Sequence, residues 1–507
     1  MNQRKLGVIL SYVYVFLSNG ISLFYTPYML RMMGQSEYGL NGTAMSITSY
    51  LSLLSFGIGG SYIRFNVRYR ANNDIEGERR LNGMFFTIFA FLSLIVIIVG
   101  AVMVAGAGKL TENSFTETET VKLRIIITLL IINTVVVFLF TVIVANLMAN
   151  EEFIIMKVVS IVIAVITPLL NIIALKCGGR AISITAISLV LCIAMHLSYY
   201  ICARKKYNFK FSFRGFKWSE IKEVFIFSSF LFLNSISDQI TTSTDNVVLS
   251  AVKGTAAVSV YTIGASFQTY FLSLSSTIAG VFTTQINRVV VESTDLDEIN
   301  RLYIKISRIQ FYIISLLLIG FTCIGHEFIV IWAGKEYYDS YWIGLILMVS
   351  SSIPLFQNLG LEIQKAFNKH KARSIVYLLV AFVNIGLTIP FAKKWGGIGA
   401  ALATFICVWC GQVIWMNYYY AKHIHLNMKS YWKSILSVIP SMILPIIVGV
   451  NFKLFWNFTS IWDVLFVAII IMIVYSFSVW MFGLNDYEKN IVKKPIKKLV
   501  LKVKKTS

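Results

Sequence analysis

Four polar residues stand at helical spacing within an apolar stretch of the sequence, residues 223–250. They are Asn234, Asp238, Thr241 and Asp245, separated by 4, 3 and 4 positions, so they share one face of a helix. A carboxylate at the centre of a membrane helix costs about 2.5–3.5 kcal/mol, and it usually faces a cavity or a partner. We therefore interpret Asp238 and Asp245 as candidates for binding a coupling ion or a proton, with Asp238 the deeper of the two.

Hydrogen bonding between helices is the structural alternative for both carboxylates, and Asp245 also fits a position at the outer headgroup level. A related stripe without carboxylates, formed by Asn19, Ser22 and Thr26, lies in the apolar stretch 8–30. We interpret the two stripes as facing walls of a water-filled central cavity.

Three arginines are candidates for holding an anionic substrate. Arg31 follows the first apolar stretch, and Arg64 and Arg288 follow two others. A guanidinium group binds two phosphate oxygens at once, which suits a diphosphate. The alternatives are that Arg31 extends to the outer headgroups and that Arg64 and Arg288 anchor helix ends on the cytoplasmic side.

The composition identifies the kind of protein that must position these residues. Of 507 residues, 57% are hydrophobic and only 14% are charged, with a mean hydropathy of +0.72. A soluble domain is about 45–50% apolar and about 25% charged, so soluble enzymes, disulfide scaffolds and disordered chains are excluded. At roughly 20 residues per crossing, the apolar residues suffice for about fourteen helices. We expect an all-α polytopic membrane protein.

The lysines and arginines predict its orientation. With the N-terminus inside, 34 of the 45 basic residues fall on the cytoplasmic side and 11 outside, as expected for a membrane protein. An even number of crossings then places both termini in the cytoplasm, and the net charge of +21 needs no nucleic-acid partner. The expected spans are 8–30, 39–63, 83–107, 124–148, 154–175, 181–203, 223–250, 256–285, 309–331, 342–364, 374–392, 397–421, 434–455 and 462–482.

The segments between these spans are too short to fold as catalytic domains. The longest cytoplasmic one, starting at Arg204, has about 20 residues. No complete nucleotide-binding or zinc motif is present in the sequence. We expect a transporter rather than an enzyme, with no cofactor and no metal site.

An internal repeat relates the first six spans to the next six. Matching residues recur at a nearly constant offset, and six spans per unit give both units the same orientation in the membrane. This predicts an N-terminal lobe at 1–222, a second lobe at 223–421 and a C-terminal part at 422–507. The matching pairs are Asn19 with Asn234, Gly34 with Gly254, Arg64 with Arg288, Asn150 with Asn368, and Gly178 with Gly396.

Two segments resemble a known family. Gly34-Gln35-Ser36-Glu37-Tyr38-Gly39-Leu40 is similar to the lG-x-x-x-YGl segment of the polysaccharide flippases, and Gly396-Gly397-Ile398-Gly399-Ala400-Ala401-Leu402-Ala403-Thr404 is similar to their GiiGAalAt segment. With two six-helix lobes and an additional pair, the whole chain resembles the Wzx-type oligosaccharide flippases of the multidrug/oligosaccharidyl-lipid/polysaccharide (MOP) exporter superfamily.

The resemblance implies that the protein flips an undecaprenyl-diphosphate-linked oligosaccharide across the cytoplasmic membrane by alternating access, for assembly of a surface polysaccharide. It implies a cationic cavity, for which Arg31, Arg64 and Arg288 are the candidates, with Asn19 and Asn234 placed for sugar hydroxyls. The expected partners are this lipid-linked substrate, membrane lipids, and possible polysaccharide polymerase and glycosyltransferase proteins.

Two other functions stay open. A multidrug or cation antiporter of the same superfamily would use the stripe with Asp238 and Asp245 as its cation site. A membrane glycan polymerase is a weaker alternative, since such enzymes need a long outer loop with catalytic residues and the outer segments here are short.

Overall fold

The computed structural model describes residues 3–216, 218–292, 296–367, 369, 371–490 and 493. Within these residues every regular element is a helix, which confirms the all-α class. In chain order the elements are α1 (Gln3–Met33), α2 (Gln35–Ser49), η1 (Tyr50–Ser55), α3 (Ile58–Ala71), α4 (Ile75–Thr111), α5 (Glu117–Ala149), α6 (Phe153–Lys176), α7 (Ala181–Tyr207), α8 (Trp218–Lys253), α9 (Thr255–Glu292), α10 (Leu296–Trp332), η2 (Lys335–Tyr337), α11 (Asp339–Phe356), α12 (Leu359–Ala366), α13 (Lys371–Val408), η3 (Trp409–Trp415), α14 (Met416–Tyr419), η4 (Tyr420–Ile424), α15 (Met428–Leu436), α16 (Pro440–Phe455), α17 (Ile461–Ser478) and η5 (Val479–Gly483).

The helices are those of a multi-pass membrane protein. In the described part of the chain, nine are long and apolar enough to cross a bilayer, or ten if one bent pair forms a single span. One of the nine, Ala372–Ile424, has 53 residues and contains a non-helical residue at Gly396. Since one crossing needs about 20 residues, this stretch is long enough for two. The number of fourteen crossings stays a prediction.

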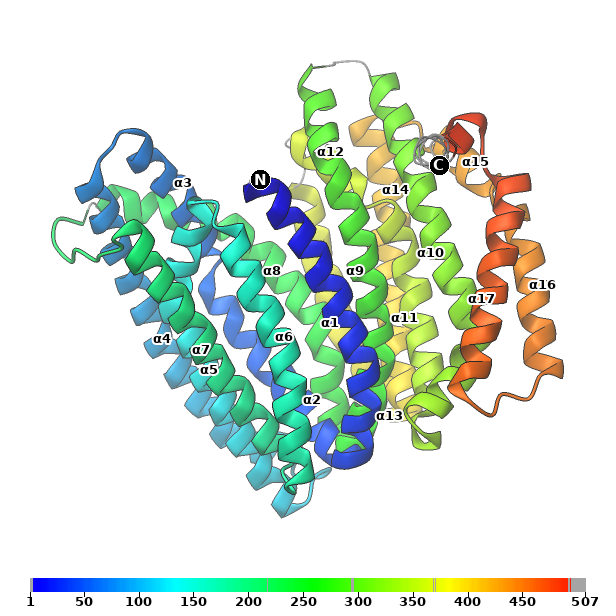
Figure 1. The fold of residues 1–507 in the computed structure, drawn as a ribbon, viewed down its shortest axis with the longest axis horizontal. Helices are drawn as coiled ribbons and strands as arrows, with labels where there is room; N and C mark the ends of the chain where they lie inside the picture. The colour runs from blue at the N-terminus through cyan, green and yellow to red at the C-terminus, as the bar shows by residue number, and fades with distance from the viewer. Residues whose placement is uncertain are drawn as a thin grey trace, which may run out of the picture. The chain divides into compact units, whose positions relative to one another are not determined.

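The chain packs into two compact units. Unit 1 comprises Met1–Thr262 and Tyr377–Ala403, and unit 2 comprises Ile263–Val376 and Thr404–Ser507. In unit 1, α4, α5 and α7 lie side by side (Figure 1). In unit 2, α10 packs against α16 and α17 (Figure 1).

Unit 1 holds a buried polar cluster where α3, α4 and α5 meet. The Tyr62 hydroxyl donates to Asn82 Oδ1 at 2.5 Å and accepts from the amide nitrogens of Asn66 and Asn146, each at 3.0 Å. Both amides also donate to Glu78 Oε1, at 3.1 and 3.2 Å. Because these groups bond one another, they can be buried without losing the hydrogen bonds that water would supply.

Glycine conformations support the internal repeat. Gly34 and Gly254, which precede α2 and α9, have φ of 82° and 83°. Gly178 and Gly396, the other matched pair, have φ of 86° and 58°. Residues with a side chain rarely adopt positive φ, so glycine is favoured at both members of each pair. Asn368, the expected counterpart of Asn150, lies outside the described residues.

The first family-like segment includes a close packing contact. A Cβ atom at Gly39 in α2 would overlap the backbone carbonyl of Thr255, the first residue of α9. The same segment carries Glu37, which pairs with Lys122 of α5 and accepts a hydrogen bond from the Ala181 backbone at 3.3 Å. The segment therefore fixes the ends of four helices of unit 1 relative to one another.

Gly39→Ala is expected to destabilise the protein by about 1–3 kcal/mol, because the methyl group must displace the α9 backbone. Gly20→Ala in α1 is the control, since nothing lies within 4 Å of a Cβ there and alanine favours a helix. Thermal unfolding in detergent measures both. Equal stability of the two variants would contradict the contact.

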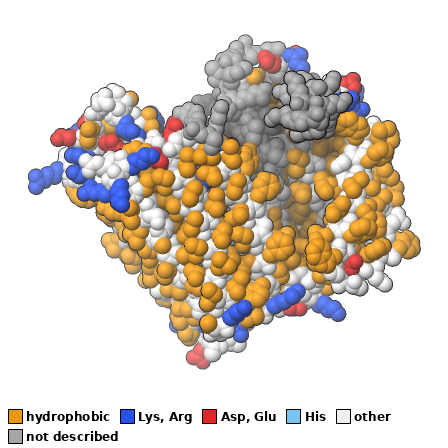
Figure 2. Space-filling view, in the orientation of Figure 1, with side chains coloured by type: hydrophobic (Ala, Val, Ile, Leu, Met, Phe, Trp, Pro, Cys, Tyr) orange, Lys and Arg blue, Asp and Glu red, His pale blue; other side chains and the backbone are white. Residues whose placement is uncertain are grey.

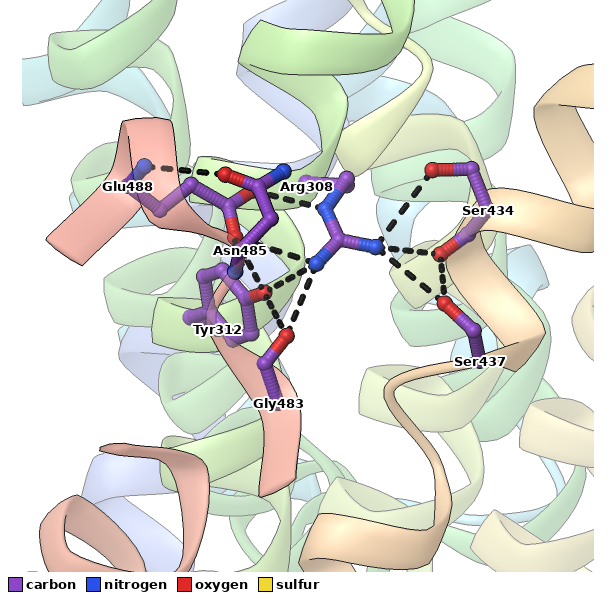
Figure 3. A network of polar contacts seen from close by, with 7 residues as sticks. All are labelled: Arg308, Tyr312, Ser434, Ser437, Gly483, Asn485 and Glu488. Carbon is purple, nitrogen blue, oxygen red and sulfur yellow. Dashed lines mark hydrogen bonds and ion pairs between the residues drawn. The ribbon is translucent and has the colours of Figure 1, made fainter. Parts of the chain in front are cut away.

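Unit 2 is held together by a buried ion pair between α10 and the segment after η5. Arg308 Nε donates to Glu488 Oε1 at 2.6 Å and Arg308 Nη2 to Glu488 Oε2 at 3.0 Å (Figure 3). The two side chains are 7% and 4% exposed. Tyr312, one turn further along α10, donates to Glu488 Oε2 at 2.9 Å and accepts from Arg308 at 2.7 Å. Both oxygens of the carboxylate are therefore engaged by α10.

The remaining donors of Arg308 bind backbone carbonyls before α16 and after α17. One guanidinium nitrogen donates to the Ser434 carbonyl of α15 at 2.6 Å, and the other to the Gly483 carbonyl at 2.8 Å (Figure 3). Asn485 caps the next turn by a 2.9 Å hydrogen bond from its backbone to Glu488. One side chain of α10 thus fixes the ends of both α15 and η5.

Glu488→Gln is expected to destabilise the protein by about 3–5 kcal/mol, because the change leaves Arg308 buried without its counter-charge. The control is Glu362→Gln, which breaks the 2.9 Å pair with the more exposed Lys365 and costs about 1 kcal/mol or less. Unfolding temperatures in detergent give the comparison. If the Glu488→Gln variant is as stable as the Glu362→Gln control, the buried pair contributes little to the stability of the protein.

Candidate functional site

The second predicted span, 39–63, is broken in the structure. α2 ends at Ser49, the tighter helix η1 follows, and α3 starts only at Ile58. Phe56 and Gly57, between η1 and α3, both have left-handed backbone, with φ of 49° and 67°. Non-helical backbone at membrane depth is tolerated only where protein surrounds it or where it lines a water-filled cavity. The break is therefore the first candidate for a functional site in unit 1.

Two serine side chains bond to the preceding turn at this break. Ser49 Oγ donates to the Ser46 carbonyl at 2.7 Å, and Ser52 Oγ donates to the Ser49 carbonyl at 2.6 Å. Such bonds to a carbonyl of the preceding turn compete with the helical ladder and bend it. Gly57 then supplies the residue that accepts positive φ at no steric cost.

Polar side chains of α8 contact this break. Gln239 Nε2 donates to Ser49 Oγ at 2.6 Å, and the hydroxyls of Ser49 and Ser243 lie 3.0 Å apart. The hydroxyl of Tyr50, the first residue of η1, lies 2.8 Å from Thr244 Oγ1. These groups are uncharged, and each both donates and accepts hydrogen bonds.

The same row of neutral contacts continues in both directions along α8. Towards the start of the helix, the hydroxyls of Ser61 and Ser228 lie 3.0 Å apart. Towards its end, Asn246 Nδ2 donates to Ser46 Oγ at 3.0 Å. We call this row, from Ser228 to Asn246 on α8, the polar seam. Its two ends lie about 27 Å apart along the helix, close to the thickness of the hydrocarbon layer. Between Ser228 and Gln239 the contact is apolar, with the ring centroids of Phe56 and Phe232 4.3 Å apart.

Asp245 lies beside the seam and is buried, with 1% of its surface exposed. Its carboxylate accepts a hydrogen bond from Tyr261 of α9 and another, at 3.1 Å, from Thr388 Oγ1 of α13. Asn384, one turn before Thr388 on the same helix, is also buried. Asp245 is thus a desolvated carboxylate held by hydroxyl groups. Within the described residues, no cluster of three or more His, Cys, Asp or Glu side chains is placed to hold a metal ion.

The other predicted site residues lie in different surroundings. Asp238, two turns before Asp245, is exposed, and Asn19 is half-buried in α1. Arg31 is exposed in the last turn of α1. Arg64 is exposed in α3 and pairs with Glu223 at 3.3 Å.

Arg31 and Arg64 lie on different helices, α1 and α3. All of α2 and η1 lies between them along the chain, and α2 alone, with 15 residues, is about 22 Å long. The remaining two predicted residues, Asn234 and Arg288, have side chains outside the described part of the structure.

Sequence reasoning missed most of the seam, because it looked for charges. A signal was present nonetheless: seven of the eight residues from Gln239 to Asn246 are polar within the predicted membrane span 223–250. Such a density of hydroxyl and amide groups in a membrane span requires partners on a neighbouring helix.

Residues 5–283 match the model of a family described as polysaccharide biosynthesis protein. The chain belongs to this family. A Bacillus subtilis (strain 168) protein, named uncharacterized membrane protein EpsK, is 21% identical over 431 residues, which cover 81% of this chain and 83% of EpsK.

Solved structures identify the fold of this family member. The inward closed conformation of the lipid II flippase MurJ matches with a TM-score of 0.67 at 18% identity, covering 93% of this chain and 98% of MurJ. An inward-facing multidrug resistance MATE transporter of the MOP superfamily matches with a TM-score of 0.56 at 14% identity, covering 79% and 97%. A MOP superfamily transporter from Pyrococcus furiosus matches with a TM-score of 0.53 at 12% identity, covering 82% and 95%.

These likenesses confirm the resemblance found in the sequence. This polysaccharide biosynthesis protein shares its fold with MurJ and with a MATE transporter of the MOP superfamily.

Proposed function

We propose that this protein flips an undecaprenyl-diphosphate-linked oligosaccharide across the cytoplasmic membrane, from the inner to the outer leaflet, for assembly of a surface polysaccharide. The family is one of polysaccharide biosynthesis, and the fold is shared with a lipid II flippase. The observation that carries the proposal is the polar seam. In this structure its hydroxyls and amides bond one another and several are buried; separation of α8 from the broken span would offer them, over about the depth of the hydrocarbon, to a hydrated glycan that must pass without binding tightly anywhere.

The moving parts of this proposal are the lobes 1–222 and 223–421, with 422–507 attached and both termini in the cytoplasm. The lobes open alternately to each side of the membrane, while the polyprenyl chain stays in lipid. Arg31, Arg64 and Arg288 bind the diphosphate. Asn19 and Asn234 bind sugar hydroxyls. Glycosyltransferases act before the flipping step, and a polymerase acts after it.

Cells that lack the protein are expected to accumulate polyprenyl-linked glycan in the inner leaflet, and the wild-type gene should clear it. Rescue by the double variant Gln239→Leu, Thr244→Val should fall about tenfold, a transport barrier raised by roughly 1.4 kcal/mol. The control is Thr128→Val in α5, whose hydroxyl bonds only to its own helix at 2.8 Å.

Two results would contradict the proposal. The absence of accumulated glycan in the deletion strain would remove the flippase function. Full rescue by the seam variant, at equal protein abundance, would remove the role of the seam while leaving the function intact.

A second function, cation antiport by the same fold, is favoured by Asp245. A carboxylate buried in the membrane binds a cation or a proton more readily than an exposed one, because either neutralises it. We propose that Asp238 and Asp245 couple transport to an ion gradient, with buried Asp245 carrying most of the effect. Coupling of this kind serves a flippase or an antiporter.

Asp245→Asn is therefore expected to remove the dependence of transport on an ion gradient, whereas Asp238→Asn should weaken it less. Glycan turnover in reconstituted vesicles, with and without an imposed proton or sodium gradient, measures this dependence. Unchanged dependence in Asp245→Asn would exclude the coupling role. Transport of a cationic drug in place of the glycan would identify the antiporter.

A further inference from the structure

Residues 208–216 join α7 to α8 in unit 1 without helix or strand, and we call them the strap. Asn208 ends α7 in the left-handed conformation, with φ of 49°. The following sequence alternates aromatic residues with lysine, serine and arginine, as Phe-Lys-Phe-Ser-Phe-Arg. The strap lies at the end of unit 1 that holds α3 and the start of α4 (Figure 1).

The strap is pinned to α4. The Ser212 backbone N–H donates to the Arg79 carbonyl at 2.9 Å, and Asn82 Nδ2 donates to the Lys210 carbonyl at 3.0 Å. A Cβ at Gly83 would overlap the Ser212 carbonyl, so the two backbones are in direct contact. The strap therefore presents its side chains from a fixed position.

Its phenylalanines form a ladder from the core to the surface. Phe209 is buried, and its ring centroid lies 5.0 Å from that of Phe211. Phe211 stacks on Phe213 at 6.0 Å and packs against Phe86 of α4 at 4.9 Å. Phe213 is 57% exposed and Phe216 is 36% exposed. The outer end of the ladder is thus apolar surface held rigidly away from the core.

Basic side chains surround this apolar end. Figure 2 shows Lys and Arg gathered over the same end of unit 1. Lys205 and Arg214 are exposed and Lys210 is half-buried. Among the described residues, no ion pair involves any of these three cations.

Neighbouring cations are already occupied. Lys206 pairs with the buried Glu152, and Arg80 pairs with Asp74 at 3.8 Å. Burial alone would raise the pKa of Glu152, but hydrogen bonds from Lys206 and Tyr207 outweigh it, so the pKa lies below its ordinary value. Glu152 is consequently ionised at neutral pH and neutralises Lys206.

We propose that the strap docks onto anionic phospholipid headgroups of the adjoining leaflet, with Phe213 and Phe216 inserted at the hydrocarbon edge and Lys205, Lys210 and Arg214 on the phosphates. α4 and α7 are membrane-crossing helices that start and end beside the strap, which places it at the membrane surface. Aromatic side chains flanked by basic ones bind such surfaces through apolar burial together with charge attraction.

The test compares the binding of phosphatidylglycerol and of phosphatidylcholine to the purified full-length protein. Native mass spectrometry measures how much of each lipid is bound. Each basic residue near an anionic surface contributes roughly a fivefold factor in affinity. Lys205→Gln with Arg214→Gln should therefore weaken phosphatidylglycerol binding about 25-fold and leave phosphatidylcholine unaffected. The matched control is Lys393→Gln with Lys394→Gln, which removes two exposed lysines of α13.

Two further measurements keep the test independent of folding defects. Phosphatidylglycerol binding to the wild-type protein should decrease as salt rises, because exposed charges are screened. Phe213→Ser should increase amide hydrogen exchange of the strap in phosphatidylglycerol nanodiscs. Equal loss in both charge variants, salt-independent binding, or a requirement for a polyprenyl diphosphate in place of phosphatidylglycerol would overturn the proposal.

Discussion

Hydrogen bonding away from water is the constraint on which this structure depends. Inside a bilayer a polar group has no water, so each one must find a protein partner or line a wet space. Unit 1 meets this requirement along α8, where hydroxyls and amides bond to the broken second span. Ser49, whose hydroxyl bonds to the preceding turn at the break, also contacts Gln239 and Ser243 of α8.

Unit 2 meets the same requirement with charge. Arg308 is an arginine in a helix long and apolar enough to cross a membrane, and Glu488, in the helical turn that follows η5, neutralises it. The surrounding hydroxyls and carbonyls use the remaining donors, which is the condition for a buried ion pair to be tolerated. The seam on α8 and the contacts of Arg308 thus solve one physical problem by different chemistry, neutral along the seam and ionic at Arg308.

Much of the fold could be predicted from the sequence. Apolar stretches of about 20 residues dictate membrane helices, and the family-like segment around Gly39 owes its pattern to a backbone contact that only glycine allows. The break after Ser49 could not be predicted in this way. The leucines that stand among the serines of this segment keep its hydropathy high enough for an apolar span. Hydropathy does not say which helix will supply hydrogen bonds.

The candidate site was predicted less well than the fold. Periodicity places Asp245 on one stripe with Asp238, but it does not distinguish an exposed position such as Asp238 from one covered by two other helices such as Asp245. Arg308 was counted only as a cytoplasmic charge, since its partner lies 180 residues away. Burial and long-range pairing are properties of the packed chain, and a single sequence contains no direct measure of either.

The interruption in the second span also constrains how the protein is made. Neither α2, with 15 residues, nor α3, with 14, is long enough to cross a bilayer of about 30 Å as a helix. Their serine partners on α8 are synthesised almost 200 residues later. Until the ribosome has delivered α8, the serine and tyrosine hydroxyls of this part of the nascent chain lack their partners on that helix. Completion of unit 1 is therefore a late step of biogenesis. The early helices remain incompletely packed until α8 has been synthesised.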